Sequence, residues 1–217
     1  MAWTRSYFSC SIVLGLVMCA ATLTQAKEIG QFVGQADIGD TGEAGSVEFD
    51  EASGKYTIAG SGADMWAKAD AFHYLYRQAS GDVALMADIH WLGEGGDRNR
   101  KACLIVRQSL EPGSAYVDAA AHGDGHIALQ WRTTADGETG DAESKVVANP
   151  RTMRIEKRDD QFQMFAATAG EELKPIGEPF KLHLTLPFYI GLGVCSHDSS
   201  KLERVEFTKV KIEKLSE

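Results

Sequence analysis

Alternation of apolar and polar residues with a period of two constrains this chain more than any other feature. In DVALMADIHWL, residues 82–92, every second residue from Val83 to Trp91 is apolar. Such spacing suits an extended strand with one buried face and does not fit the 3.6-residue period of a helix. Similar runs recur between turn residues, among them Gly123-Asp124-Gly125 and Asp159-Asp160. We count ten to thirteen strands and no helix of several turns, which predicts an all-β antiparallel sandwich or barrel.

The first 26 residues differ from the rest of the chain. Arg5 is their only charged residue, an apolar run extends from Phe8 to Leu23, and Thr24-Gln25-Ala26 precedes the charged Lys27. This pattern predicts a secretory signal peptide over 1–26 and a single β-sandwich domain over 27–217. Lipidation at Cys19 is disfavoured because the bulky Met18 precedes it. No later stretch has 18 consecutive apolar residues, so we expect no transmembrane anchor and a secreted or periplasmic protein.

The charge balance bears on the partners. The full chain has a net charge of −9, and loss of Arg5 with the leader would make it more acidic. An acidic surface repels nucleic acid and anionic lipid, so we expect neither as a partner.

Two of the four cysteines, Cys10 and Cys19, lie in the leader, which leaves Cys103 and Cys195. An oxidising compartment permits one disulfide between them, and two separate buried thiols are equally compatible with the sequence. Both alternatives stay open. The sequence has no CxxC pair and no Cys/His cluster with the spacing of a structural zinc site.

Four ordered blocks resemble a known family: YTIAGSGADMWAKADAFHYLY (56–76), KACLIVRQSLEPGSAYV (101–117), LQWRTTADGETG (129–140) and YIGLGVCSHD (189–198). They are similar to bacterial exported domains of concanavalin A-like lectin/glucanase fold, described as similar to the regulation of enolase protein or as TolB-like biopolymer-transport modules. The resemblance covers about residues 46–214. It implies a jelly-roll of two packed antiparallel sheets and polysaccharide binding. Cys103 and Cys195 stand where small residues are expected, which suggests a substituted pair peculiar to this chain, with a disulfide between them as one alternative.

Glycan binding would need an aromatic ring for the apolar sugar face and planar polar groups for hydroxyls. The ligand-binding candidates that the blocks supply are Asp64, Trp66, His73, Arg107, Arg132 and His197. The alternative is a buried network that ties residues 60–77 to the sheets, with Trp66 in the core and Arg107 paired to Asp64 or Asp70. In either case Trp131 and Arg132, being adjacent in a strand, point to opposite faces.

Two sequence features suggest metal sites. HGDGH, residues 122–126, places two His around an Asp, although Gly-Asp-Gly between alternating runs is also a hairpin turn. Calcium is the second candidate, because acidic residues crowd the N-terminal region: Asp37, Asp40, Glu43, Glu48 and Asp50. They lack the alternating spacing of a defined calcium loop, and we expect no obligate cofactor.

The sequence lacks the catalytic motif of the known glucanases of this fold. Retaining glucanases of concanavalin-like fold carry E-x-D-x-x-E on one strand face, and the nearest string here, EFDEAS (48–53), lacks the last acid. The favoured hypothesis is therefore a non-catalytic module that binds a glycan or polysaccharide. A cell-envelope structural or protein-interaction domain is the first alternative. A glycoside hydrolase with unconventional carboxylates is the second.

Overall fold

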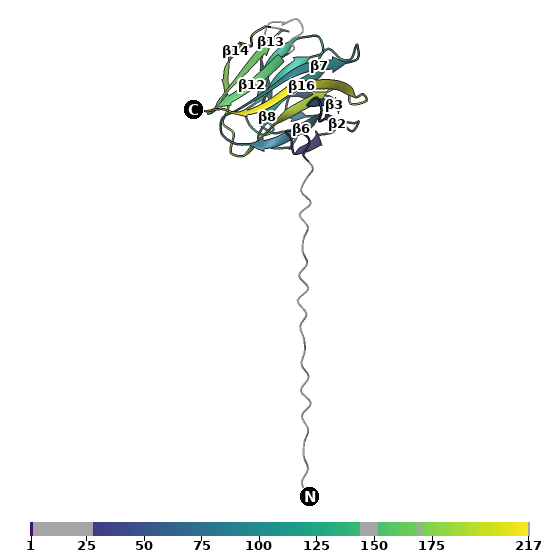
Figure 1. Ribbon diagram of the computed structural model, residues 1–217, viewed down its shortest axis with the longest axis vertical. Coiled ribbons are helices and arrows are strands. Elements are labelled where there is room, and N and C mark those ends of the chain that lie inside the picture. The colour runs from purple at the N-terminus through teal and green to yellow at the C-terminus, as the bar shows by residue number, and fades with distance from the viewer. Residues whose placement is uncertain (2–27, 144–151, 169–170, 217) are drawn as a thin grey trace.

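The computed structural model describes residues 1, 28–143, 152–168 and 171–216. The predicted signal peptide, 1–26, therefore lies outside the described residues apart from Met1. Strands form two large antiparallel sheets and one two-stranded hairpin (Figure 1). This architecture confirms the two-sheet jelly-roll sandwich and removes the barrel as an alternative. None of the described segments forms a helix that is long and apolar enough to cross a membrane.

Sheet I is the sheet with the order β1-β6-β15-β8-β9-β10-β11. Its strands are β1 (Gly34–Ile38), β6 (Phe72–Ala79), β15 (Phe188–Cys195), β8 (Lys101–Arg107), β9 (Tyr116–His122), β10 (Ile127–Arg132) and β11 (Thr139–Glu143).

Sheet II has the order β14-β13-β12-β7-β16-β3-β2 and faces the viewer in Figure 1. Its strands are β14 (Lys174–Lys181), β13 (Gln161–Ala167), β12 (Thr152–Arg158), β7 (Val83–Leu92), β16 (Glu203–Lys214), β3 (Lys55–Gly60) and β2 (Ser46–Asp50). The hairpin pairs β4 (Met65–Trp66) with β5 (Ala69–Asp70).

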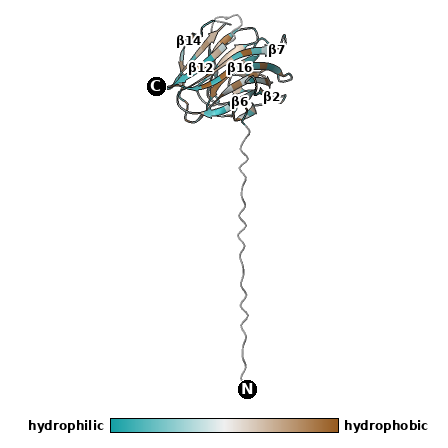
Figure 2. Ribbon diagram, viewed as in Figure 1, coloured by the Kyte–Doolittle hydropathy of each residue, from teal (hydrophilic) through white to brown (hydrophobic). Residues whose placement is uncertain are grey.

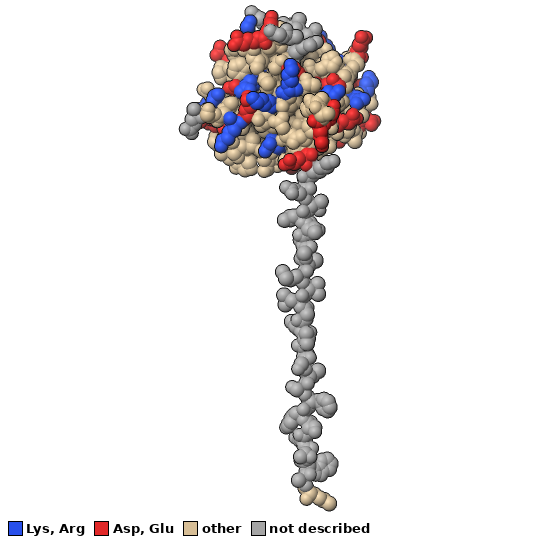
Figure 3. All heavy atoms as spheres, viewed as in Figure 1, with Lys and Arg blue, Asp and Glu red and all other residues tan. Residues whose placement is uncertain are grey.

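The main core lies between the two sheets and follows from the alternation in the sequence. Leu85 and Ile155 of sheet II and Leu104 of sheet I are fully buried in one cluster. On β12 the outward residues Thr152, Arg154, Glu156 and Arg158 are polar, and apolar and polar colours alternate along the strands of sheet II (Figure 2). That outer face carries interspersed acidic and basic side chains (Figure 3), for example Arg154 with Glu213. It is a solvated surface without an excess of one charge.

The described residues contain sixteen strands rather than ten to thirteen. Part of the excess is β1, in the Gly-rich region 29–45, and the two-residue strands β4 and β5. The alternation in FKLHLTLP, residues 180–187, favours a strand over its whole length, whereas β14 ends at Lys181 and residues 182–187 form no strand. Pro175 and Pro179 lie in β14, and this strand is at the edge of sheet II, where a missing N–H donor is tolerated.

A second, smaller core lies on the outer face of sheet I. Residues 61–71, which we call the cover segment, include the β4–β5 hairpin and fold over that face. Met65 is buried there against a cluster that includes Phe72, Tyr74 and Ile105. The backbone is held as well, because Asp70 N donates to Pro112 O at 3.0 Å. Strand β6 follows this segment, as the run of aromatic residues in FHYLY favours.

Glycines of β15 make room for this second core. A Cβ at Gly193 would lie 2.5 Å from Ile105 Cδ1 and 3.0 Å from the Phe72 ring, and one at Gly191 would lie 2.8 Å from the Tyr74 ring. Aromatic side chains of β6 can therefore lie flat over the neighbouring strand. The alternation of glycine in YIGLGVC has this steric cause.

Asp70 anchors the cover segment through two buried arginines. Its carboxylate pairs bidentately with Arg132, with oxygen–nitrogen distances of 2.7 and 3.0 Å, and lies 3.5 Å from Arg107 Nη2. All three side chains are at most 1% exposed. Arg107 also donates to the carbonyls of Ser109 and Glu111. The structure thus bears out the predicted buried Arg107–Asp pair, with Asp70 as the partner.

We expect Asp70→Ala to lower the free energy of unfolding by about 3–5 kcal/mol, because it strands two buried guanidinium groups. Urea denaturation measures this loss. Lys68→Ala, in the same hairpin, is the matched control: its pair with Glu138 is 3.6 Å long and mostly exposed, so a change of about 0–1 kcal/mol is expected. Equal effects of the two substitutions would contradict the anchoring role.

Candidate functional site

A cleft of about 370 Å³ remains beside the cover segment on the outer face of sheet I. Polar side chains dominate its lining, which consists of Asp64, Trp66, Arg98, Asn99, Lys101, His122, Asp124, His126, Gln130, Asp141 and His197. They come from the cover segment, from β8 to β11 and from three connecting loops. Ala120 and Ala128 are register partners on the same face of β9 and β10 as His122 and Gln130, and these small side chains leave the floor low.

Trp66 forms one wall of the cleft and is 37% exposed. The register of the hairpin pairs Met65 with Asp70 and Trp66 with Ala69. Because side chains alternate along a strand, inward Met65 and Asp70 require outward Trp66. Lys101 Nζ lies 5.5 Å from the Trp66 ring centroid, which helps to position the ring. The alternative that Trp66 fills the core is therefore wrong, and Met65 fills it instead.

A charged network holds the cleft end of the cover segment. The buried Lys101 Nζ donates to Asp64 Oδ1 at 2.7 Å and to Met65 O at 2.9 Å. The second oxygen of Asp64 lies 3.3 Å from His197 Nε2. His197 Nδ1 in turn lies 3.5 Å from Asp97 Oδ1. These contacts fix Asp64 and His197 at the cleft with limited freedom to move.

Two side chains of the lining, Gln130 through Oε1 and His122 through Nε2, have a buried polar atom without a hydrogen-bond partner among the described residues. Beneath the lining, both carboxylate oxygens of Asp118 have no N–H or O–H partner among them, and the Cys103 thiol is their neighbour. Gln130 is 2% exposed and Asp118 fully buried. Buried polar groups are nearly always hydrogen-bonded, so such a concentration marks a place where water or a ligand completes the bonding.

Burial also shifts the protonation equilibria of this floor. It raises the pKa of Asp118 to about 7, with the nearby Lys101 acting in the opposite direction. It lowers the pKa of His122 to about 4, and Lys101 adds to that effect. At neutral pH His122 is therefore an uncharged imidazole.

Backbone strain accompanies two residues of this region. Ala67, next to Trp66, has φ = 49°, and His197 has φ = 60°. Such left-handed conformations are costly for residues with a Cβ and tend to occur at functional sites. The carbonyl of Ala67 accepts hydrogen bonds from Arg132 and from Thr139 Oγ1, which holds the turn in place.

The structure brings together three of the six predicted ligand-binding residues, Asp64, Trp66 and His197, at the cleft. Arg107 and Arg132 lie under the cover segment as the partners of Asp70, so direct ligand contact by them is corrected to an anchoring role. Trp131 stacks on Phe180 at 3.9 Å, away from Arg132, as the alternation predicts.

His73 is the sixth predicted residue, and the structure places it elsewhere. It is buried on the opposite face of β6, where its Nδ1 lies 2.7 Å from Asp37 Oδ1 and its Nε2 3.1 Å from Gln35 Oε1. His73 lies between Phe72 and Tyr74 in the strand, and because successive side chains point to opposite faces, His73 faces away from both. His73 therefore joins β6 to β1 and does not reach the cleft.

Cys103 and Cys195 are both buried free thiols, so of the two alternatives that the sequence left open the structure has the separate thiols and not the disulfide. The register pairs Cys103 with Gly193 and Cys195 with Lys101, which makes the two cysteines diagonal neighbours. Diagonal Cα atoms are typically about 7–8 Å apart, whereas a disulfide needs about 4.4–6.8 Å. Burial raises the pKa of Cys195 to about 12, so its thiol is unreactive at neutral pH.

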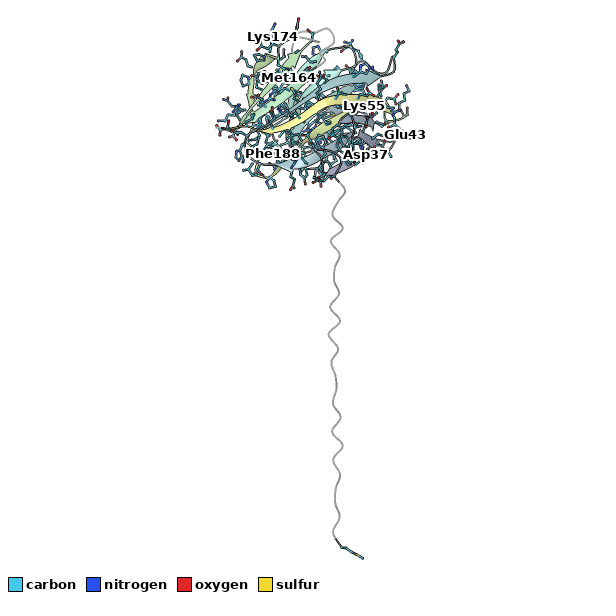
Figure 4. All side chains as sticks on the ribbon, in the orientation of Figure 1. Asp37, Glu43, Lys55, Met164, Lys174 and Phe188 are labelled. Atoms are coloured by element: carbon cyan, nitrogen blue, oxygen red, sulfur yellow. The ribbon has the colours of Figure 1, made fainter. Side chains whose placement is uncertain are left out.

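Neither expected metal site is assembled among the described residues, where no group of three or more His, Cys, Asp or Glu could hold an ion. HGDGH forms the β9–β10 hairpin turn, with His122 N donating to His126 O at 2.8 Å. The acidic residues of the N-terminal region have separate partners: Asp37 contacts His73 and the Gly45 amide, and Asp50 contacts Ser53. Figure 4 shows Asp37 and Glu43 at distinct places near this end of the molecule.

A larger cleft of about 670 Å³ adjoins Trp91, Arg100 and His122. The Arg100 guanidinium covers the Trp91 ring at 4.3 Å and pairs with Glu203 at 2.5 Å. The aromatic face is therefore occupied. The rim at Asp88 also adjoins Thr152, which follows residues that the structure does not describe.

The sequence analysis did not identify Lys101, Gln130 and Asp141 of the lining or Asp118 beneath it, and it named His122 only as a candidate metal ligand. The signal was present in the hairpin pattern. Pairing YVDAAAH with HIALQWR through the Gly-Asp-Gly turn places Asp118 opposite Gln130 and puts both on the face of Arg132. The pattern does not show that the cover segment leaves the cleft open beside Gln130.

No family model and no curated protein sequence matches this chain. Solved structures resemble it in fold. A functionally unknown protein from Saccharomyces cerevisiae has 16% identity and a TM-score of 0.65 over 88% of this chain and 100% of its own. A xylan β-1,4-xylosidase from Bacillus halodurans has 13% identity and a TM-score of 0.55, and 77% of this chain spans 34% of that enzyme. A carbohydrate-binding module from Bacillus subtilis has 13% identity and a TM-score of 0.50, and the match covers 85% of this chain and 98% of the module. At these identities the likeness shows the concanavalin-like jelly-roll fold.

Asp118 predicts a specific pH dependence of stability. In the unfolded chain its pKa is about 4, and in the folded protein it is about 7. Between these values the folded state retains a proton that the unfolded state has lost, so the Asp118 contribution falls as pH rises, by on the order of 1.4 kcal/mol per unit. His122, with its lowered pKa, acts oppositely below about pH 6.5.

We therefore expect the free energy of unfolding of the wild type, relative to that of Asp118→Asn, to fall between about pH 4 and pH 7. Urea denaturation of both proteins across this range measures the difference, in which the His122 contribution cancels. Parallel curves would show that Asp118 has an ordinary pKa.

Proposed function

We propose that this protein is an exported module that binds a glycan in the cleft beside Trp66. One observation carries the proposal: an exposed Trp ring adjoins a polar cleft, and unpartnered polar atoms of Gln130 and His122 belong to the lining of the same cleft. A flat aromatic face beside fixed hydrogen-bonding groups is the arrangement that pyranose rings require.

The neighbours in fold support the same class of ligand. One is a xylan β-1,4-xylosidase and another is a carbohydrate-binding module, so the fold occurs in proteins that act on or bind glycans. Fold alone does not transfer function, and the weight of the proposal rests on the cleft.

The proposal includes the remaining features of the chain. Residues 1–26 serve as a signal peptide, residues 27–217 form one domain, and the protein is secreted or periplasmic. The resemblance to the regulation-of-enolase and TolB-like modules is proposed as the family relationship.

Glycoside hydrolysis is the alternative with a specific observation behind it, because carboxylates lie on both sides of the cleft. Asp64, however, is paired with Lys101, and Asp124 with Arg98 at 3.0 Å. The carboxyl whose pKa is raised, as a general acid needs, is Asp118, and it is fully buried below the lining. A non-catalytic binding role therefore fits the placement better. An envelope-protein partner remains the other alternative.

Trp66→Ala should weaken glycan binding at least tenfold, about 1.4 kcal/mol, through loss of the stacking face. The measurement is a glycan array followed by pull-down on insoluble polysaccharides, with and without calcium. Leu186→Ala is the matched control, since Leu186 is a 60% exposed apolar residue outside the cleft lining. Wild type that binds no glycan, or a folded Trp66→Ala that binds normally, would refute the proposal.

A further inference from the structure

Acidic side chains outnumber Lys and Arg side chains in the lining of the cleft. Lys101 is paired with Asp64 and Arg98 with Asp124, so neither cation is free. Asp141 lines the cleft on β11 and has no cationic partner among the described residues. An anionic ligand would therefore meet one unpaired carboxylate and no uncommitted cation in this lining.

The floor adds hydrogen-bond acceptors in a single row. Gln130 of β10 is the register partner of Asp118 on β9 and of Asp141 on β11. Directly paired residues point to the same face of a sheet, and the two that line the cleft, Gln130 and Asp141, form what we call the acceptor row. Gln130 Oε1 is buried without a hydrogen-bond partner among the described residues, and Asp118 lies fully buried beneath the lining.

A buried acceptor that has no donor partner in the protein favours a ligand group that brings a donor. A carboxylate ligand brings further acceptors and negative charge, whereas a hydroxyl brings a hydrogen to donate. Leaving a buried acceptor unpaired costs about 1–3 kcal/mol, and a ligand that supplies the donor recovers part of that cost. The ligand group that fits this floor is an uncharged polyol.

We propose that the cleft selects uncharged sugar units whose hydroxyls donate to the acceptor row, and that it excludes uronic acids. This inference rests on the proposed glycan binding and specifies the substrate class. Gln130, which reaches the lining, is the specificity-determining residue, and Asp141 excludes anions by its charge.

The test is isothermal titration calorimetry with matched pairs of oligosaccharides of glucose and of mannose. Each is compared with its counterpart of the same linkage and length, oxidised to the uronic acid at the primary alcohol. We expect the neutral member of a bound pair to bind at least tenfold more tightly at low ionic strength. Equal or tighter binding of the carboxylated member overturns this inference and leaves glycan binding standing. Absence of binding by both members of every pair, at concentrations that would saturate a module of this kind, overturns the proposed function and the inference with it.

Two substitutions assign the selectivity to residues. Gln130→Leu should weaken binding of the neutral ligand about tenfold with the fold retained by circular dichroism. Asp141→Lys, at an exposed position of the edge strand β11, should strengthen binding of the carboxylated ligand at least threefold. Glu178→Lys makes the same change of net charge at an exposed position of sheet II and should have no such effect. Equal responses to the two lysine substitutions would overturn the role of Asp141.

Discussion

The carboxylate of Asp70, buried between Arg132 and Arg107, is the interaction on which the rest of the site depends. Together with the Lys101–Asp64 pair it holds residues 61–71 over sheet I, because the apolar contribution of the segment to that face is chiefly Met65. The two guanidinium groups in turn require the carboxylate, since an isolated buried charge is strongly unfavourable. Segment and sheet therefore stabilise one another.

The site is a geometric consequence of that anchor. Once Asp70 points inward, the hairpin register turns Met65 inward and Trp66 outward. The segment packs against Phe72, Tyr74 and Ile105, and the cleft opens beside it over His122, Gln130 and Asp141. The strained turn at Ala67 is held by Arg132, the same residue that holds Asp70.

The sequence predicted the fold well because alternation reports directly on which face of a strand is buried. The sequence analysis also gave a buried Arg107–Asp pair, as the alternative to ligand contact by Arg107, and the structure contains that pair with Asp70. Three of the six candidate ligand residues lie away from the cleft, and the causes are particular. The assignment of His73 did not take into account that His73 alternates with Phe72 and Tyr74 and so faces the other side of the strand. Arg132 was assigned to a ligand, whereas its guanidinium group pairs with Asp70. The floor around Gln130 depends on a tertiary crossing of residues 61–71, which no local pattern encodes.

The most direct test of this account follows the indole N–H resonance of Trp66 in an NMR titration of the mature, ¹⁵N-labelled protein with a bound oligosaccharide. Trp66 stands in the open cleft, whereas the Trp91 ring is covered by Arg100 and the Trp131 ring by Phe180. The account predicts a saturable shift of the Trp66 resonance with the other two indole signals nearly unchanged. A shift confined to Trp91 or Trp131, or no shift under saturating ligand, would contradict the placement of the binding site.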